Sequence, residues 1–212
     1  MTARVSRDRW NHNIHYHPLV LGAVPPGCGR ALDVGCGDGL LARELRGRVP
    51  HVIGIDLHAP SLERARSQPL PGVEYVLGDV LAHPFEPASF ELVAAVAALH
   101  HMDTPRGLER MVELLRPGGV LVVIGLARSD HPLDLAIDAA AVVASRIRRL
   151  RNGYWQQSAP TVWPPANSYS DVRALAAAFL PGAGYRRHLY FRYSLVWSRP
   201  AGPAVRAAAP SG

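Results

Sequence analysis

The chain has 212 residues, of which 48% are hydrophobic and 19% charged, so it suits one compact domain and is not intrinsically disordered. Its two cysteines are too few for a disulfide framework or a four-cysteine zinc site. No apolar run reaches the ~18 residues of a membrane span. The polar N-terminus resembles no signal peptide. These features predict a soluble, cytoplasmic protein.

The net charge of +6 is unevenly distributed, and all 23 basic residues are arginine. Residues 1–126 hold 12 arginines against 13 acids, whereas residues 127–212 hold 11 arginines against 4 acids. The basic excess therefore belongs to the last third of the chain. We interpret it as a solvated face, with nucleic acid, anionic lipid or an acidic substrate as alternative partners.

Short β-branched apolar runs alternate with helical patterns through residues 30–126, which is typical of a parallel sheet with crossover helices. Strands are expected at residues 30–34, 51–57, 73–77, 90–98 and 120–126. Helices are expected at residues 40–46, 61–66 and 104–115, the last of them ended by residues 116–119. The pattern predicts a doubly wound, Rossmann-like α/β fold.

The regular alternation of strand and helix patterns ends after residue 127. The sequence predicts helices at residues 133–150 and 171–180, strands at 185–190 and 193–197, and a low-complexity, disordered tail at 200–212. Asp134 and Asp138 lie near the start of the long helix and its arginines near the end, which suits the helix dipole. The same helix could lie at lipid headgroups, but the two aspartates count against that reading.

A glycine-rich turn, Asp33-Val-Gly-Cys-Gly-Asp-Gly39, joins the first strand to the first helix. Leu40 replaces the third glycine of a dinucleotide fingerprint, and no P-loop Gly-Lys-Ser/Thr follows. The acid before the first glycine suits a ligand with a positive centre. Asp56 and Asp79 end the next two strands, so three acids line one crevice, where Asp56 can accept both hydroxyls of a ribose.

From residue 31 to 126 the sequence resembles a class I S-adenosylmethionine-dependent methyltransferase. Leu-Arg-Pro-Gly-Gly at 115–119 is a further hallmark, and Leu-His-His-Met-Asp at 99–103 is similar to a segment of small-molecule members. The resemblance implies seven strands, the first five parallel and the last antiparallel, with an N-terminal helical segment and a helical lid insertion. The expected parts of one domain, 1–199, are an N-terminal lid (1–28), a cofactor-binding core (30–126), a substrate-lid insertion (128–170) and the last helix and strands (171–199).

The resemblance also implies S-adenosylmethionine as the cofactor. Its methionine part would lie on Asp33 and the glycine loop, its ribose on Asp56, and its adenine on Leu57 and Asp79. The full set of expected cofactor-binding residues is Asp33, Gly35, Cys36, Gly37, Gly39, Asp56, Leu57, Asp79, Val80, Ala97 under the sulfonium, and the lid residues His15 and Tyr16.

His100 and His101 follow the fourth strand, where it opens onto the expected cofactor, and are the candidate catalytic residues. A base is needed only if the nucleophile carries a proton that must leave, so either histidine can instead be an ordinary polar residue closing a strand. Residues 11–17 are a candidate lid or a polar segment leading into a helix. No carboxylate or cysteine accompanies their histidines, so no metal is predicted.

We expect residues 128–170 to choose the substrate. Trp155, Trp163 and Tyr169 could form an apolar wall for a flat acceptor, or could pack under a loop. The predicted function is methyl transfer to an O or N atom of a small, partly aromatic metabolite, with a homodimer possible. The alternatives are RNA methylation, which the isoelectric point near 9.9 favours, and a catalytically silent S-adenosylmethionine-binding partner subunit.

Nucleic-acid methylation is disfavoured because residues 94–98 lack the N/D-P-P-Y/F box of base-amino methyltransferases. No added RNA-binding domain is present in the sequence. The silent-subunit reading is disfavoured by the intact set of acids and glycines.

Overall fold

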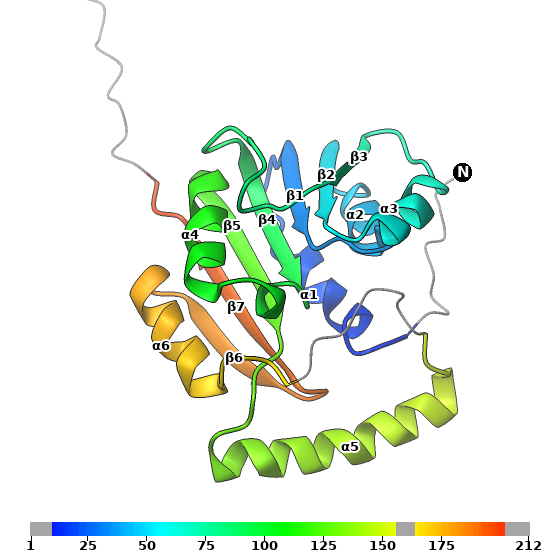
Figure 1. Cartoon of the computed structure of the whole chain (residues 1–212), viewed down its shortest axis with the longest axis vertical. Coiled ribbons are helices and arrows are strands. Elements are labelled where there is room, and N and C mark those ends of the chain that lie inside the picture. The colour runs from blue at the N-terminus through cyan, green and yellow to red at the C-terminus, as the bar shows by residue number, and fades with distance from the viewer. Residues whose placement is uncertain (1–9, 156–163, 202–212) are drawn as a thin grey trace, which may run out of the picture.

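Seven strands form a single sheet in the computed structural model, which describes residues 10–155 and 164–201 (Figure 1). The strand order is β3-β2-β1-β4-β5-β7-β6. The strands are β1 (Arg30–Val34), β2 (His51–Asp56), β3 (Val73–Leu77), β4 (Phe90–Val96), β5 (Leu115–Gly125), β6 (Gly184–His188) and β7 (Arg192–Ser198).

Neighbouring strands from β3 through β5 are parallel, and β7 runs antiparallel to both β5 and β6. The predicted Rossmann-like sheet with an antiparallel last strand is therefore confirmed. The chain moves outward from β1 to β3 and then crosses to β4 on the other side of β1. This reversal places a topological switch point between β1 and β4, where open α/β sheets bind ligands at the carboxyl ends of their strands.

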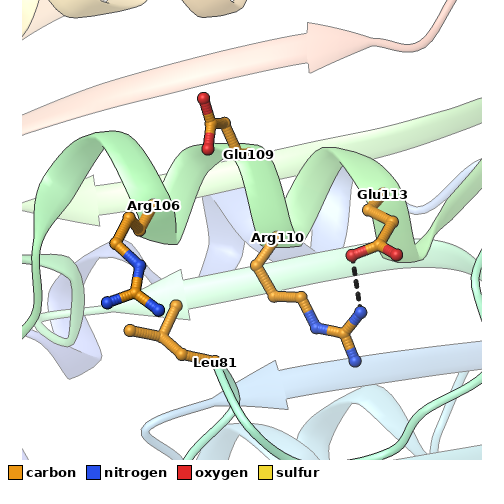
Figure 2. A pocket seen from close by; sticks show the side chains of 5 residues that line it. All are labelled: Leu81, Arg106, Glu109, Arg110 and Glu113. Atoms are coloured by element: carbon orange, nitrogen blue, oxygen red, sulfur yellow. Dashed lines mark hydrogen bonds and ion pairs between the residues drawn. The ribbon is translucent and has the colours of Figure 1, made fainter.

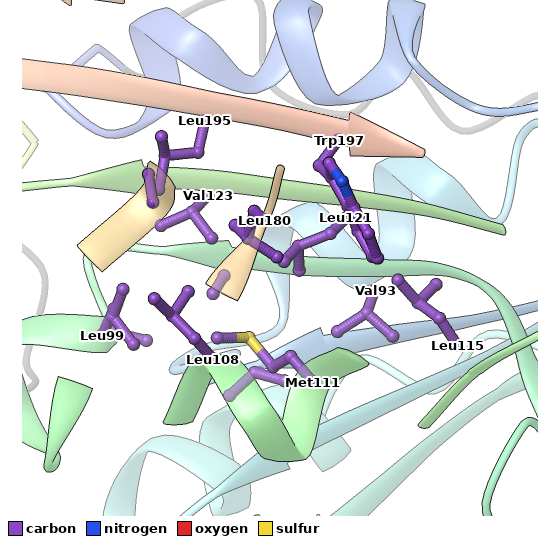
Figure 3. Close-up of a cluster of buried hydrophobic side chains, with 14 of the residues drawn as sticks. Val93, Leu99, Leu108, Met111, Leu115, Leu121, Val123, Leu180, Leu195 and Trp197 are labelled. Atoms are coloured by element: carbon purple, nitrogen blue, oxygen red, sulfur yellow. The ribbon is translucent and has the colours of Figure 1, made fainter. Parts of the chain in front are cut away.

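Helices cover both faces of the sheet. They are η1 (Ile14–Tyr16), α1 (His17–Gly22), α2 (Leu40–Leu45), α3 (Ala59–Arg66), η2 (Leu99–His101), α4 (Thr104–Leu114), α5 (Pro132–Asn152) and α6 (Tyr169–Phe179). The apolar side chains of α4 and α6 pack with those of β4, β5 and β7 in the larger core cluster (Figure 3). Those of α1 and α2 pack on the opposite face. Because β4 and β5 are covered on both sides, their sequences are nearly continuous apolar runs.

Most expected boundaries differ from the structure by one or two residues, and the largest difference is at the start of β5. β5 begins at Leu115, directly after α4, and not at residue 120. Leu115 pairs with Phe90, and the register then shifts so that Val120 pairs with Leu92. The turn-forming residues 116–119 are accommodated as an irregularity within the strand, with Gly118 at a φ of +80°.

α5 lies apart from the other helices, beyond the carboxyl ends of β1 and β4 (Figure 1). Its 21 residues include two aspartates and several arginines. Among the residues that the structure describes, no helix is long and apolar enough to cross a membrane. The tail predicted to be disordered lies, from residue 202 onward, outside the described residues.

Candidate active site

The glycine loop is held between the ends of β2 and β4. Gly35 has a φ of +68°, and a Cβ on it would lie 2.5 Å from the Ala98 Cβ, so only glycine fits here. The backbone N–H groups of Gly35 and Cys36 both donate to the Ile55 carbonyl, at 2.8 and 3.2 Å. The loop is therefore rigidly placed at the predicted switch point.

The Cys36 side chain faces away from this edge and into the sheet. Its Sγ lies 2.8 Å from where a Cβ on Gly54 would stand. Burial raises the pKa of the Cys36 thiol far above its ordinary value, so the thiol stays protonated and unreactive. Only the backbone of Cys36 can contribute to a ligand site.

Asp33, at the end of β1, carries a buried carboxylate oxygen that lacks a donor. Its side chain is 2% exposed, and among the described residues Oδ2 has no hydrogen-bond partner. Burial, and then the nearby charge of Asp56, raise the pKa of Asp33 to about 7. An orphaned carboxylate of this kind is completed by a cationic donor such as an ammonium group.

Asp56 is fixed by two backbone donors. Its Oδ2 accepts from Gly37 N at 2.7 Å, and its Oδ1 accepts from His58 N at 2.8 Å. Each carboxylate oxygen keeps a second lone pair, so the group can still accept hydroxyls. The next side chain, Leu57, is 71% exposed and offers an apolar surface at the same edge.

The third acid lies on a loop braced by α4. Asp79 Oδ1 accepts from Leu81 N at 2.9 Å. The Val80 side chain belongs to the core, so only its backbone can line a site. Arg110 of α4 donates from Nε to the Val80 carbonyl at 3.2 Å and from Nη2 to the His83 carbonyl at 2.7 Å.

Figure 2 shows Arg110 in a shallow depression on the outer side of α4, with its ion pair to Glu113 at 2.6 Å. None of the candidate site residues lines this depression. Of its lining residues, Arg110 braces the loop that follows Asp79.

The end of β4 holds a strained alanine. Ala97 has a φ of +54°, a conformation that L side chains seldom adopt, and its N–H donates to the Ile124 carbonyl at 2.7 Å. Such strain persists only where the surroundings enforce it, and it is concentrated at functional sites. The strain at Ala97 is consistent with a functional position, and its place under the sulfonium stays a prediction.

His100 and His101 follow in η2, with ring centroids 4.1 Å apart. Burial, helped by His101 and Arg192, lowers the pKa of His100 to about 3, and its buried Nδ1 has no partner among the described residues. His101 is exposed, and partial burial lowers its pKa while the charge of Asp56 opposes that change. The pKa of His101 responds to Asp56 and that of His100 to Arg192, so the pair lies between these two charged residues.

Arg192 connects the sheet to a roof over this edge, which we define as residues 10–16, 154–155 and 189–191. Its side chain donates to Asn13 Oδ1 from Nε at 3.1 Å and from Nη2 at 2.6 Å. Its Nη1 donates to the carbonyls of Tyr190 and Phe191. Burial lowers the pKa of Arg192 to about 10, which leaves it charged. No carboxylate of the described chain pairs with it.

Aromatic rings fill the roof. Tyr190 and Phe191 both have a φ of +59°, so the turn between β6 and β7 is strained. The Tyr190 ring stacks on His12 at 5.4 Å and meets Trp10 edge-on at the same distance. The backbone N–H of Trp155 donates to the Trp10 carbonyl at 2.8 Å, which joins the roof to the segment that follows α5.

The predicted lid residues contact this roof. The Tyr16 hydroxyl donates to the Leu189 carbonyl, and burial raises the pKa of Tyr16 to about 12. His15 is exposed and meets Tyr190 edge-on. Both side chains therefore fasten the N-terminal segment to the β6–β7 turn, and their contact with a cofactor stays a prediction.

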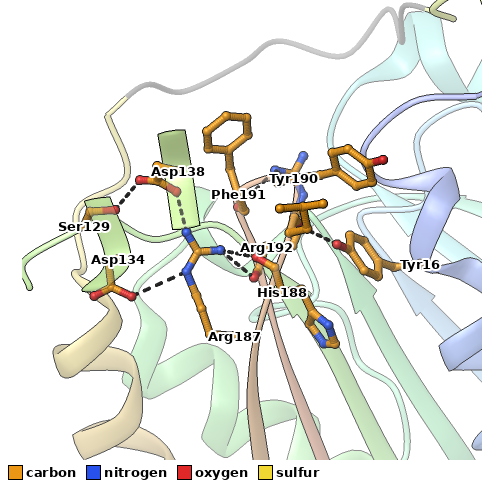
Figure 4. A network of polar contacts seen from close by, with 10 residues as sticks. Tyr16, Ser129, Asp134, Asp138, Arg187, His188, Tyr190, Phe191 and Arg192 are labelled. Carbon is orange, nitrogen blue, oxygen red and sulfur yellow. Dashed lines mark hydrogen bonds and ion pairs between the residues drawn. The ribbon is translucent and has the colours of Figure 1, made fainter. Parts of the chain in front are cut away.

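A second buried arginine attaches α5 to the sheet. Arg187 of β6 forms an ion pair with Asp138 and approaches Asp134 to 3.6 Å (Figure 4). Its guanidinium also lies 3.9 Å over the ring of Tyr169. Tyr169 is 1% exposed and belongs to the core, so it does not line an acceptor wall. Of the two other rings expected there, Trp155 lies in the roof and Trp163 lies outside the described residues.

Asn13 was expected only as a polar lid residue, and Arg187 and Arg192 were not expected in the site at all. Arg192 meets Asn13 across 179 positions, and no local pattern marks such a pair. In the described part of the chain, no three His, Cys, Asp or Glu side chains gather as a metal site would require.

Comparisons with known proteins agree with this geometry. A family model described as a methyltransferase domain matches residues 32–123. An uncharacterized methyltransferase of Mycobacterium tuberculosis (strain ATCC 25618 / H37Rv) is 38% identical over 193 residues, which cover 90% of this chain and 98% of the relative. The chain belongs to the class I S-adenosylmethionine-dependent methyltransferases.

Two further methyltransferases are similar over less of the chain or only in fold. The ubiquinone biosynthesis O-methyltransferase of Xylella fastidiosa is 35% identical over 140 residues, covering 63% of this chain and 55% of that protein. The S-adenosylmethionine-bound amino pentose methyltransferase of Micromonospora echinaspora superposes with a TM-score of 0.61 at 19% identity, covering 90% of this chain and 92% of that one. That structure shows the shared fold alone.

The methyltransferase uses S-adenosylmethionine, and the residues present fit that cofactor. The donor-free Asp33 oxygen suits its ammonium group, the fixed carboxylate of Asp56 suits its ribose, and the exposed Leu57 suits its adenine. The expected contacts with individual atoms of the cofactor stay predictions.

Proposed function

We propose that the methyltransferase acts on an O or N atom of a small, partly aromatic molecule held between the end of β4 and the roof. The observation that carries this proposal is the state of His100. Its imidazole is uncharged, largely buried, and has an Nδ1 without a partner in the described chain. A neutral imidazole nitrogen can accept a hydrogen bond from a hydroxyl or amine.

The low pKa of His100 defines its role. A group with a pKa of about 3 is a poor proton acceptor near neutral pH, because general bases work best when their pKa lies near the working pH. We infer that His100 orients the nucleophile and does not retain its proton. His101 is exposed and close to Asp56, so it is the better route for that proton to reach water.

S-Adenosylmethionine supplies, when bound, a methyl group on a good leaving group. The chain must then hold the nucleophile within ~3 Å of that methyl group, in line with the bond that breaks. The rigid glycine loop and Ala97 would fix one side of this arrangement, and His100 the other. The aromatic roof supports a small acceptor with a flat part. The Xylella relative is an O-methyltransferase, which supports transfer to oxygen.

The test is single-turnover methyl transfer from deuterated S-adenosylmethionine to a panel of hydroxylated and amino-substituted aromatic compounds, followed by mass spectrometry. With an acceptor found, His100→Ala should slow the chemical step about tenfold, the worth of one good hydrogen bond, with S-adenosylhomocysteine affinity unchanged. His51→Ala, at an exposed histidine at the amino end of β2, is the matched control. An unaltered rate in the His100 variant contradicts the assignment.

Two results would replace the proposal. Transfer to RNA alone favours the nucleic-acid alternative. Tight cofactor binding without transfer to any acceptor favours the silent partner subunit.

A further inference from the structure

α5 is an amphipathic helix that turns its polar side inward. Asp134 and Asp138 face Arg187 of the sheet, and Ser145 lies 3.0 Å from the His12 ring nitrogen in the roof. All three side chains are buried or half-buried. Ala141 is fully buried on the same side and Ala144 packs against the second core cluster, so the helix is attached by charges, hydroxyls and small apolar side chains, while its larger apolar side chains are left outside.

The opposite side of α5 is apolar and exposed. Leu133 is 70% exposed and Leu150 is 88% exposed. Between them, Leu135, Val143 and Ile147 are also exposed, at spacings that place them on one side of a helix. We call these five residues the outer face of α5. Nothing in the described chain packs over it, although a helix of this length normally buries its apolar side.

The exposed charged residues of α5 itself are all arginine, and the exposed Asp130, three residues before Leu133, accepts a hydrogen bond from Ser170. From residue 139 to residue 170 the chain contains no acid, whereas Arg146, Arg148, Arg149 and Arg151 lie in the last turns of α5. Arg148 and Arg149 stack on rings of the roof, over Trp10 at 5.7 Å and over Tyr154 at 4.1 Å. Arg146 and Arg151 are exposed and have no ion pair in the described part of the molecule.

The two aspartates no longer argue against a lipid partner. From the sequence, Asp134 and Asp138 place negative charge on the same helix as the apolar residues. In the structure both point inward and share the single positive charge of Arg187 (Figure 4). An anionic surface approaching the last turns of α5 from outside meets valine, isoleucine and leucine flanked by arginine.

We propose that the outer face of α5 docks the protein on an anionic phospholipid surface, with α5 lying in the plane of the interface. Apolar side chains flanked by cations are the features by which a helix binds there. Charge complementarity favours this occupant over a second copy of the chain, which would bring the same arginines. Docking would place the roof, which contacts the end of α5, next to the membrane.

The test is sedimentation of the full chain with vesicles. Vesicles of phosphatidylglycerol and phosphatidylcholine should bind the protein, and vesicles of phosphatidylcholine alone should bind it at least tenfold more weakly. Val143→Ser/Ile147→Ser should lose most of the binding. Arg146→Gln/Arg151→Gln should weaken it about 30-fold, because each surface cation contributes about fivefold.

The matched control is Arg106→Gln/Arg186→Gln, which removes the same charge from exposed positions on α4 and β6. It should bind vesicles as the unchanged protein does. If both double arginine variants weakened vesicle binding equally, the attraction would depend on net charge alone, and the proposal would be overturned. Circular dichroism and S-adenosylhomocysteine binding check that every variant is folded, independently of any methyl acceptor.

Two other outcomes overturn it as well. No vesicle binding, together with a dimer that Val143→Ser/Ile147→Ser dissociates in analytical ultracentrifugation, assigns the outer face to a second copy. No vesicle binding by a monomer leaves the outer face as exposed apolar surface without a lipid partner.

Discussion

Replacing Asp56 by alanine tests two roles of its carboxylate, which are to hold the glycine loop and to bind the ribose of the cofactor. In the structure its carboxylate accepts from Gly37 N at 2.7 Å and from His58 N at 2.8 Å, and so ties the glycine loop to the end of β2. In the bound state it is expected to accept the ribose hydroxyls as well. A hydrogen bond to a charged group contributes about 1.5–3 kcal/mol.

We therefore expect Asp56→Ala to weaken binding of S-adenosylhomocysteine by about 2–3 kcal/mol, or roughly 30- to 150-fold, in a calorimetric titration. The loop should also lose stability, because two backbone N–H groups are left without an acceptor. We expect this loss of stability to total about 1–2 kcal/mol, which should lower the melting temperature by roughly 2–8 °C for a domain of this size. Asp56→Asn keeps one acceptor oxygen, so its cofactor affinity and melting temperature should lie between those of the unchanged protein and of Asp56→Ala.

Asp171→Ala is the matched control. Its Oδ2 also accepts a backbone N–H, from Ser168 at 2.8 Å, but at the start of α6. It should cost about 1 kcal/mol of stability through the lost helix cap and leave the cofactor affinity unchanged. Unchanged affinity in Asp56→Ala would refute the ribose assignment, and a fall in melting temperature alone would make Asp56 a brace for the loop.

Three further changes test the site and its supports. Because the pKa of Asp33 is raised from 3.8 to about 7, the folded chain binds the proton more tightly, so stability without cofactor should fall as the pH rises through that window. Asp33→Asn should flatten this slope in thermal unfolding, and an identical slope would contradict it. Arg187→Met leaves two carboxylates unpaired, at a cost of about 3–5 kcal/mol, and should speed tryptic cleavage in α5. Arg186→Met is its control, and equal cleavage rates would count against the role of the ion pair. Gly35→Ala should lower S-adenosylhomocysteine affinity at least tenfold, because its Cβ would clash with Ala98 and a left-handed φ costs about 1–2 kcal/mol; normal affinity would show that the loop tolerates movement.

Sequence reasoning succeeded where the physical signal is local. The ranges of β1 and β3 were predicted to the residue, and the glycine loop lies as expected, because alternating apolar runs and glycine clusters act over a few positions. The start of β5 was wrong because an irregular strand can contain turn residues. The inward side of α5 could not be predicted, because the direction of Asp134 depends on Arg187, far along the chain.

The roof illustrates the same limit. His12, Tyr16 and Tyr190 are ordinary polar or aromatic residues in sequence, and only the folded sheet brings His12 against Tyr190 and Tyr16 against Leu189. Buried and partnered, Tyr16 looks identical in sequence to a tyrosine that touches a ligand. Contacts between distant segments leave no periodic pattern in the sequence from which they could be predicted.

The separation of the roof's partners along the chain has a kinetic meaning. Asn11 meets Trp155 across 144 positions, and Asn13 meets Arg192 across 179. Loop-closure entropy grows only logarithmically with length, so these contacts cost little more in free energy than shorter ones, but they must wait for β7 to be in place. During synthesis the sheet edge that holds Asp33 and Asp56 can be assembled well before its cover. The roof should accordingly be the last part of the protein to form and the first to exchange its amide hydrogens.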